Sequence, residues 1–236
     1  MTQIPFIGYH CEGFPPVENA LTEPNGLLVA GGDLTPERLI EAYSKGIFPW
    51  FEDDQPILWW SPAPRAVLYP AKFTPSRSLK KTLRKKTFTI TFDTAFREVI
   101  SSCSKPRPSG DGTWITADMM DAYTQLHRLG YAHSVEAWDE KELVGGLYGI
   151  CLGSIFFGES MFSTKSDASK VAFCSLVELC NLKNIDLIDC QVANPHLASL
   201  GAVDISRTAF KKHLQALIPD KPSLNRHKGI WSTNSN

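Results

Sequence analysis

Two stretches of the sequence place acidic and amide side chains beside apolar runs that are typical of β-strands. Asp189 and Gln191 stand two residues apart in LIDCQ, near the end of IDLIDCQ, and Glu159 follows SIFFG, which we expect to end another strand. Because side chains alternate along a strand, Asp189 and Gln191 should share one face and Cys190 the other. Such groups can orient or deprotonate a bound group, or they can simply complete turns, and spacing alone favours the turns.

The segment GIFPWFEDDQPILWWSPAPR, residues 46–65, holds three of the six tryptophans of the chain. Tryptophan combines a large apolar body with one N–H donor, so it suits a core or a stacking platform equally well. Trp59 and Trp60 are adjacent, and strand-like alternation predicts that they point to opposite faces. We expect these two to anchor the proline-rich segment. For Trp50 the residues alone leave both roles open.

Basic residues are concentrated in one part of the chain. From Gln55 to Phe92 there are eight Lys or Arg and no Asp or Glu, so this segment carries +8 and the remainder −9 within a net charge of −1. Five of the eight recur at i, i+3, i+4, i+7 and i+8, one face of a helix: Arg77, Lys80, Lys81, Arg84 and Lys85. A basic helix face is usually solvated surface, but the acid-free flanks favour binding to an RNA phosphate backbone.

The bulk composition excludes several classes of protein. At 236 residues with 43% hydrophobic and 21% charged residues, the chain has the composition of an ordinary globular protein. The start has no basic region before an apolar run, and no apolar stretch is long enough to cross a membrane. The six cysteines form no C-x-x-C pair, and the six histidines show no metal-ligand spacing. We expect a cytoplasmic protein without membrane contact, with reduced thiols and without a metal.

The pattern of elements predicts an α+β, or mixed α/β, fold with a small first part. Thr35, Pro36 and Gly46 mark the start and end of a helix, and SRSLKKTLRKK reads as a second helix with Ser76 or Ser78 as its cap. After a turn-rich loop we expect an amphipathic helix with Met120, Tyr123 and Leu129 near one side. It is followed by three antiparallel strands within residues 133–160, a long helix, the strand IDLIDCQ and a final helix. The last residues, from 226, read as a tail.

Several motifs occur in a characteristic order: EPNGLLVAGGDLTPERLIEAYSKGIFPWF, ILWWSPAPRAVLYP, GTWIT, GGLYGICLGSIFFGESMFS, ASK and LIDCQVANPHLASLGA. Over roughly residues 17–207 this pattern closely resembles the leucyl/phenylalanyl-tRNA–protein transferases, and FPWF, GESMFS and LIDCQ at this spacing are specific. Residues 1–12 and 220–236 depart from the pattern.

The resemblance implies an activity and its partners. The donor is leucyl- or phenylalanyl-tRNA, with methionine used less well, and the acceptor is a protein with an N-terminal Arg or Lys. The transfer marks the acceptor for N-degron-dependent degradation. The resemblance implies no cofactor, and we expect a monomer.

The resemblance also implies a domain plan. An N-terminal segment and part of a small α+β domain (residues 1–62) precede the remainder of that domain with the basic helix (63–110). An acetyltransferase-like (GNAT-like) catalytic domain (111–236) follows.

Roles for individual residues follow from the same resemblance. Asp189 is expected to orient or deprotonate the acceptor amine, directly or through Gln191, and Glu159 to hold the cationic acceptor or the terminal adenosine. Four positions match the family's slot for the donor side chain: Leu147, Met161, Leu176 and Ile188. Trp50 and Trp114 match the positions that bind the aminoacyl-adenosine end of the tRNA. Leu147 stands where relatives can carry methionine, and Cys180 stands where a larger aromatic residue can occur. The sequence therefore does not fix the volume of the slot.

Three other functions stay in competition at this point. An acyl-CoA transferase of the same fold would need a glycine-rich pyrophosphate loop, and the corresponding segment reads TKSDAS. A tRNA-dependent ligase of cell-wall peptide bridges is disfavoured by FPWF and LIDCQ. A non-catalytic tRNA-binding protein would explain the basic helix and Trp50, but not the combination of Glu159, Asp189 and Gln191.

Overall fold

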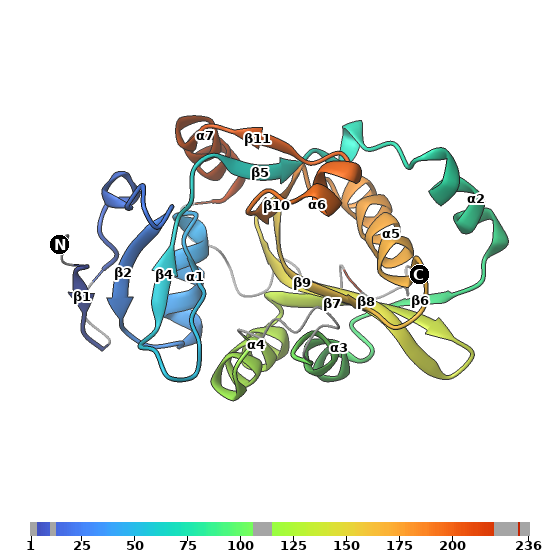
Figure 1. Cartoon of the computed structure of the whole chain (residues 1–236), viewed down its shortest axis with the longest axis horizontal. Helices are drawn as coiled ribbons and strands as arrows, with labels where there is room; N and C mark the ends of the chain where they lie inside the picture. Colours follow the sequence, from blue (N-terminus) through green and yellow to red (C-terminus); the bar gives the residue numbers. More distant parts are fainter. Residues whose placement is uncertain (1–3, 10–12, 106–114, 220–230, 232–236) are drawn as a thin grey trace.

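The structure, a computed structural model, describes residues 4–9, 13–105, 115–219 and 231. Within these residues the strands form a small sheet and a large sheet, which lie side by side along the longest axis of the molecule (Figure 1). The fold is mixed α/β, as the sequence predicts. None of the helices in the described residues is long and apolar enough to cross a membrane.

The small sheet lies at the N-terminal end of the chain and, with helix α1, forms what we call the N-terminal module. Its strands are ordered β1-β2-β4-β3: β1 (Phe6–Ile7), β2 (Leu27–Gly31), β4 (Leu58–Trp60) and β3 (Phe48–Pro49). Helix α1 (Pro36–Ser44) begins as predicted, with Thr35 Oγ1 accepting from the Arg38 N–H. Gly46 then takes a positive φ of 75°, which suits its position just beyond the helix end.

The large sheet contains the remaining strands of the described residues in the order β11-β5-β10-β9-β8-β7-β6. These are β11 (Val203–Ile205), β5 (Arg65–Leu68), β10 (Leu187–Gln191), β9 (Ile155–Ser163), β8 (Glu142–Leu152), β7 (Ala132–Asp139) and β6 (Thr89–Phe92). As predicted, β7, β8 and β9 form an antiparallel meander. Strand β10 then joins β9 in parallel, after a helical crossover.

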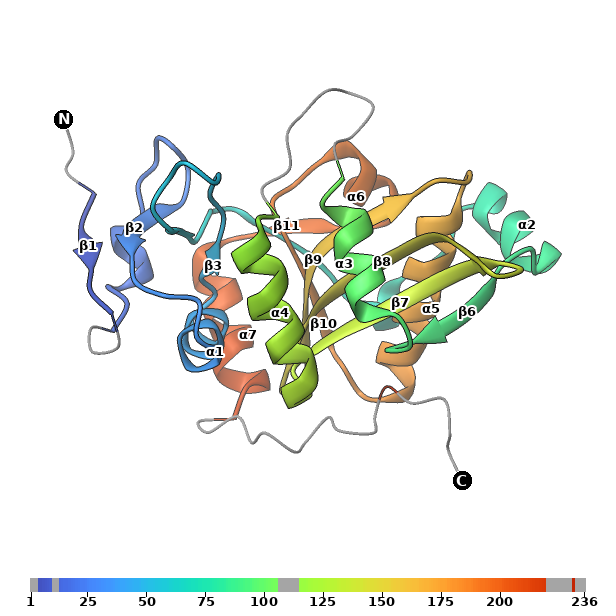
Figure 2. The ribbon, with the colours of Figure 1, turned by 90° about the horizontal axis from the view of Figure 1, so that it is seen from below.

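Helices cover both faces of the large sheet. Helices α3 and α4 pack on one face and α5 on the other, an arrangement that Figure 2 shows from the side of α4. The helices of this part are α2 (Arg77–Lys85), α3 (Phe96–Cys103), α4 (Ala117–Leu129), α5 (Ala168–Leu182), α6 (Pro195–Ser199) and α7 (Arg207–Leu217), with 3-10 turns at Val17–Asn19 and Pro70–Lys72. This order of helices and strands is compatible with the acetyltransferase-like fold that the resemblance implies.

The two faces define two apolar cores. The module-side core includes Tyr43, Trp59 and Phe157, and it continues from the N-terminal module onto the α3 and α4 face of the large sheet. The α5-side core includes Leu147 and Ile188. The N-terminal module and the large sheet therefore share a core rather than being joined by a linker alone.

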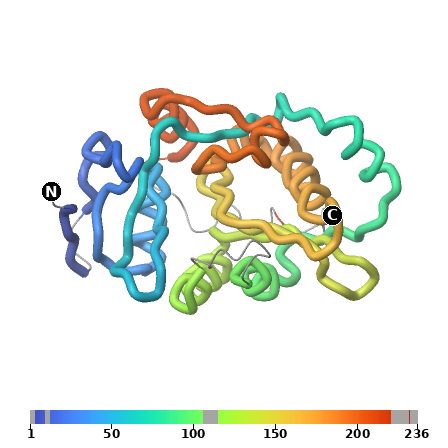
Figure 3. Tube along the Cα trace, viewed as in Figure 1, coloured from blue at the N-terminus to red at the C-terminus, as the bar shows by residue number. Residues whose placement is uncertain are grey.

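The predicted division of the chain needs one correction. Residues 63–110 were assigned to the small domain, but β5 and β6 are strands of the large sheet and α3 packs on β8 and β9. After Pro64 the chain leaves the small sheet and enters the large one, a path that can be traced along the tube in Figure 3. The short strand β5 could not be assigned to a sheet from sequence because its partners, β10 and β11, come more than a hundred residues later.

Other differences are local. The apolar face of α4 is formed by Met119, Ala122, Tyr123 and Leu126, whereas Met120 and Leu129 lie at its margins and are only half-buried. Most of the predicted C-terminal tail lies outside the described residues. Its Trp231 is described: it is buried, with its ring stacked 4.4 Å from that of His133.

Candidate active site

A cavity opens where strands β9 and β10 separate. They pair in parallel from Leu187 opposite Ile155 to Asp189 opposite Phe157, and β9 then continues alone on this side to Ser163. The cavity has a volume of about 1480 Å³, and residues of both cores line it. It therefore passes between the two strands and connects the module-side face of the sheet with the α5-side face.

Two β-bulges determine which side chains face the cavity. Opposite β8, Tyr148 pairs with Ser160 and Gly149 with Gly158, so Glu159 is the extra residue of the first bulge. Glu159 therefore lies inside β9 and not at its end, which corrects the prediction. The bulge also changes the alternation of β9: Glu159 faces the module side, while Met161 packs against the α5-side core.

The second bulge lies in β10 opposite β5, where Cys190 is the extra residue. Cys190 packs against the α5-side core, whereas Asp189 and Gln191 make their contacts on the module side. The prediction that these two share a face opposite Cys190 is therefore confirmed.

Glu159 is the centre of a hydrogen-bond network that joins three parts of the chain. Its Oε1 accepts from the Tyr43 hydroxyl of α1 at 2.6 Å and from the Gln191 amide of β10 at 2.8 Å. Its Oε2 accepts from the Tyr123 hydroxyl of α4 at 3.1 Å, and the two tyrosine hydroxyls also contact each other. Three donors therefore fix a carboxylate that lines the cavity.

The surroundings of Glu159 change its acidity. Burial raises its pKa to about 7, and the charge of Asp189 acts in the same direction, while the bonds from the tyrosines and Gln191 oppose the rise. Burial and the neighbouring Glu159 hold the pKa values of Tyr43 and Tyr123 well above the usual range, so both hydroxyls stay protonated donors. At neutral pH Glu159 can therefore both accept and release a proton, as a general base requires.

Asp189 has a different environment. It has no exposed surface, and its two oxygens accept from Arg65 Nε at 2.8 Å and Nη2 at 2.7 Å; its Oδ1 also accepts from the Gln191 backbone N–H at 2.9 Å. A direct contact between Asp189 and an acceptor amine, one of the two predicted routes, is inconsistent with this burial. The route through Gln191 is compatible with it.

The four positions predicted for the donor side-chain slot lie in one wall of the cavity. Leu147 and Met161 are cross-strand neighbours on β8 and β9, and Leu176 of α5 and Ile188 of β10 pack in the same α5-side core. Phe156 and Phe173 line the cavity as well and were not predicted. Cys180 is buried in the core behind this wall.

The tryptophans of residues 46–65 differ in exposure. Trp59 is fully buried and donates its indole N–H to the Gly31 carbonyl at 2.8 Å. Trp50 lines the cavity, is 45% exposed and lies with its ring 5.5 Å from that of Trp60. The Trp60 indole N–H donates to the Trp50 carbonyl at 2.7 Å, which fixes the backbone under the exposed ring. Trp114 lies outside the described residues.

The basic helix α2 lies at the opposite end of the molecule from the N-terminal module (Figure 1). Ser76 is its N-cap, Leu79 faces the α5-side core, and Thr82 Oγ1 donates to Asp167 at the start of α5 at 3.1 Å. All five residues predicted to bind tRNA are exposed, and within the described residues no salt bridge neutralises them. Arg65, the first cation of the acid-free segment, is instead buried against Asp189.

Comparisons with known proteins identify the family to which the chain is similar. The family described as "Leucyl/phenylalanyl-tRNA protein transferase" matches residues 67–215, and its N-terminal domain matches residues 32–63. The leucyl/phenylalanyl-tRNA–protein transferase of Saccharophagus degradans is 51% identical over 236 residues, covering 100% of this chain and 97% of that protein. The one from Stutzerimonas stutzeri is 57% identical over 210 residues, covering 89% and 92%.

The chain belongs to the leucyl/phenylalanyl-tRNA–protein transferase family. It is an aminoacyltransferase that moves an aminoacyl group from tRNA to protein. Among solved structures, L-PGS from Bacillus licheniformis matches with a TM-score of 0.43 and 11% identity, covering 82% of this chain and 73% of that one.

Sequence reasoning missed three residues of the transferase site. In the sequence analysis Tyr43 was given no functional role, Tyr123 was placed only on one side of its amphipathic helix, and Arg65 was included only in the count of eight basic residues. Spacing could not reveal them, because α1, α4 and β5 meet at the site only in the folded chain. The one available signal was that Tyr carries a hydroxyl that needs a partner when buried.

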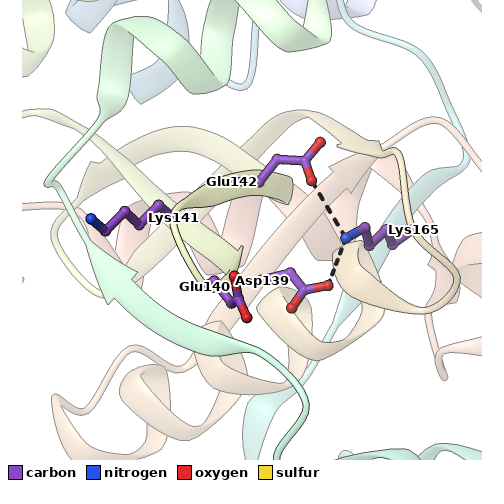
Figure 4. Close-up of a pocket in the computed structure, with 5 residues that line it drawn as sticks. All are labelled: Asp139, Glu140, Lys141, Glu142 and Lys165. Carbon is purple, nitrogen blue, oxygen red and sulfur yellow. Dashed lines mark hydrogen bonds and ion pairs between the residues drawn. The ribbon is translucent and has the colours of Figure 1, made fainter.

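A second depression of the transferase surface lies at the β7–β8 hairpin and is formed by charged side chains. Lys165 there contacts Asp139 at 2.6 Å and Glu142 at 3.4 Å, as Figure 4 shows. All five residues that line this depression are charged, and Lys165 pairs with two of its three carboxylates. Within the described part of the chain, no cluster of His, Cys, Asp and Glu could hold a metal ion.

Proposed function

We propose that this enzyme moves leucine or phenylalanine, and less well methionine, from aminoacyl-tRNA to the α-amine of an N-terminal Arg or Lys. The product would be marked for N-degron-dependent degradation. We also propose that it acts in the cytoplasm as a monomer. The observation that carries the proposal is a single cavity that combines an apolar slot, an exposed tryptophan and a carboxylate with a pKa of about 7.

The chemistry is aminolysis of an ester. The amine nitrogen bonds to the aminoacyl carbonyl carbon, the ester C–O bond breaks, and the ribose hydroxyl of the tRNA leaves with a proton. An α-amine has an ordinary pKa of about 8, so a base matched to neutral pH is sufficient to remove its ammonium proton. Glu159 supplies that base and attracts the cationic acceptor, while Gln191 and the two tyrosines hold its carboxylate in place.

The cavity positions the two substrates. The donor side chain enters the slot beside Leu147 and Met161, and its adenosine stacks on Trp50. The apolar slot can reject a side chain that differs by one methylene by only ~1–3 kcal/mol, which is why some methionine should pass. The enzyme then selects its donor by the amino acid in the slot rather than by the tRNA sequence, because contacts from α2 to phosphates carry no sequence information.

The test is transfer of radiolabelled leucine and phenylalanine from charged tRNA to a peptide that begins with Arg, with its N-acetylated copy as the control. Label on the free peptide alone is expected. Binding of charged tRNA without label on either peptide would contradict the proposal and favour a tRNA-binding protein without catalysis. Protection against thermal unfolding by CoA would point instead to an acyl-CoA donor.

Reversing the charge of Lys80, Lys81 and Arg84 to Glu is expected to weaken binding of all tRNA species alike. Each phosphate contact contributes about −0.9 to the slope of log affinity against log salt for a duplex, so that slope should become flatter. The measurement is tRNA affinity at several salt concentrations. Charge reversal of Lys141, Lys212 and Arg128, which are exposed elsewhere and give the same change in net charge, is the control. Equal losses in both variants would mean that the effect comes from net charge alone.

Trp50→Ala is expected to raise the dissociation constant of an aminoacyl-adenosine analogue roughly 5- to 150-fold, which corresponds to ~1–3 kcal/mol of stacking. Trp50→Phe keeps an aromatic face and should retain most of the affinity. Calorimetric titration of both variants measures the difference. Unchanged affinity in Trp50→Ala would assign the exposed ring to packing against Trp60.

A further inference from the structure

We propose that Arg65 is a positioning residue for the transfer reaction. Through Asp189 it holds Gln191 in the conformation from which the Gln191 amide reaches Glu159. The inference rests on the proposed function, in which Glu159 acts on the acceptor amine. Arg65 itself has an exposed fraction of 1% and therefore acts only through the residues that it contacts.

Arg65 and Asp189 form a bidentate salt bridge, in which each carboxylate oxygen accepts one hydrogen bond from the guanidinium. Nε donates to Oδ1 at 2.8 Å and Nη2 to Oδ2 at 2.7 Å, across neighbouring strands β5 and β10. A planar guanidinium that engages both carboxylate oxygens fixes the carboxylate plane as well as its position. A lysine in the same place would keep the charge but lose this orientation.

A contribution to the stability of the folded protein does not by itself explain why this charged pair is buried. Burying two charges carries a large desolvation cost, and apolar residues of similar volume are often at least as stable in such places. Arg65 Nη1 also finds no hydrogen-bond partner among the described residues, which adds to that cost. What the pair does provide is a fixed acceptor: Asp189 Oδ1 receives the Gln191 backbone N–H at 2.9 Å.

Gln191 needs that acceptor because its backbone is strained. Its φ of 62° lies in the left-handed region, which residues other than glycine adopt at a cost. The bond to Asp189 holds this conformation next to the bulge, and from it the side-chain amide donates to Glu159 at 2.8 Å. If Asp189 were not held in place, Gln191 would lose the bond that fixes its backbone. Glu159 would then lose the hydrogen bond from the Gln191 amide.

Two phenylalanine rings enclose the guanidinium and connect it to distant parts of the chain. Its central carbon lies 4.9 Å from the ring centroid of Phe48 in the N-terminal module and 4.7 Å from that of Phe210 in α7. Arg207 of α7 also bonds Ser61 Oγ at 3.3 Å and the Val17 carbonyl. Correct packing of the module and α7 thus determines where Arg65, and so Gln191, is held.

The test is a double-mutant cycle with Arg65→Lys and Gln191→Ala, assayed in single turnover at saturating charged tRNA and peptide. Arg65→Lys is expected to reduce the transfer rate about 100-fold, a loss typical of misplacement by about 1 Å. The affinity for charged tRNA should change less than about twofold, since binding does not depend on that bond. The double variant should be no slower than Gln191→Ala alone, because both changes remove the same contact.

A second pair of variants keeps the inference testable if Arg65→Lys does not fold. Phe210→Leu removes one ring from the guanidinium, and Leu214→Val alters the same buried side of α7 one turn later. Phe210→Leu should slow transfer at least about tenfold more than Leu214→Val at equal folded fraction. Equal rates in this pair, or fully multiplicative losses in the cycle, would overturn the proposal and leave Arg65 a purely structural residue.

These outcomes are separable from failure of the proposed function. If the unmodified enzyme transfers no label to the Arg peptide, the proposed function itself is wrong. If it transfers label and the Arg65 and Gln191 losses multiply, only the positioning role of Arg65 is refuted.

Discussion

Glu159→Gln should reduce the rate of transfer by about 100- to 10,000-fold, the range over which a positioned general base contributes. In the unmodified enzyme kcat/KM should rise as pH increases through about 7, because Glu159 must be ionised to accept a proton. The variant should lose that rise. Single-turnover transfer between pH 5.5 and 8.5 measures both effects.

Glu136→Gln is a matched control. Glu136 is also a fully buried carboxylate of the large sheet, and it is held by the hydroxyls of Ser134 at 2.5 Å and Thr91 at 2.6 Å. It does not line the cavity of the described residues, so its variant should keep the rate and the pH profile. A Glu159→Gln enzyme with a normal rate and profile would show that the base is elsewhere.

The same variant has an expected effect on stability. A carboxyl whose pKa is higher in the folded state binds protons more tightly there, so the folded state loses stability as pH rises from about 4.5 to about 7. Glutamine removes this loss. Glu159→Gln should therefore be more stable than the unmodified enzyme at pH 8, by up to ~3 kcal/mol, with the difference vanishing near pH 4.5. Denaturant unfolding at the two pH values measures it.

Asp189→Ala is expected to lower the free energy of unfolding by about 3–5 kcal/mol, because it leaves the Arg65 charge buried without its partner. Folded Asp189→Ala protein should transfer very slowly yet bind tRNA nearly normally, since α2 and Trp50 are untouched. Urea unfolding, tRNA titration and transfer together test this. A large loss of tRNA affinity in the folded variant would instead make Asp189 a binding residue.

The control for Asp189→Ala removes an exposed partner of the same chemistry. Asp121 pairs with Arg97 at 3.2 Å, and the two side chains are 71% and 65% exposed. Such surface pairs contribute about 0–1 kcal/mol, so Asp121→Ala should unfold almost as the unmodified protein does. Similar losses in the two variants would contradict the importance that we assign to burial.

Local signals in the sequence were sufficient to predict most of the helices and strands and the faces to which several side chains point. Thr35 and Ser76 begin their helices where capping chemistry predicts. The alternation in LIDCQ correctly placed Asp189 and Gln191 opposite Cys190. These features depend on the chain within a few residues, which is why they can be read without knowledge of the fold.

The sequence by itself therefore determined helices α1, α2, α4, α5 and α7, the meander, the basic face of α2 and the residue types needed for aminoacyl transfer. Only the tertiary structure decided how those residues are used. It brought Tyr43 and Tyr123 to Glu159, buried Arg65 against Asp189, and moved β5 into the large sheet. The physical reason is that bulges, buried charge pairs and pKa shifts depend on neighbours that lie far away in the chain, and no local pattern records them.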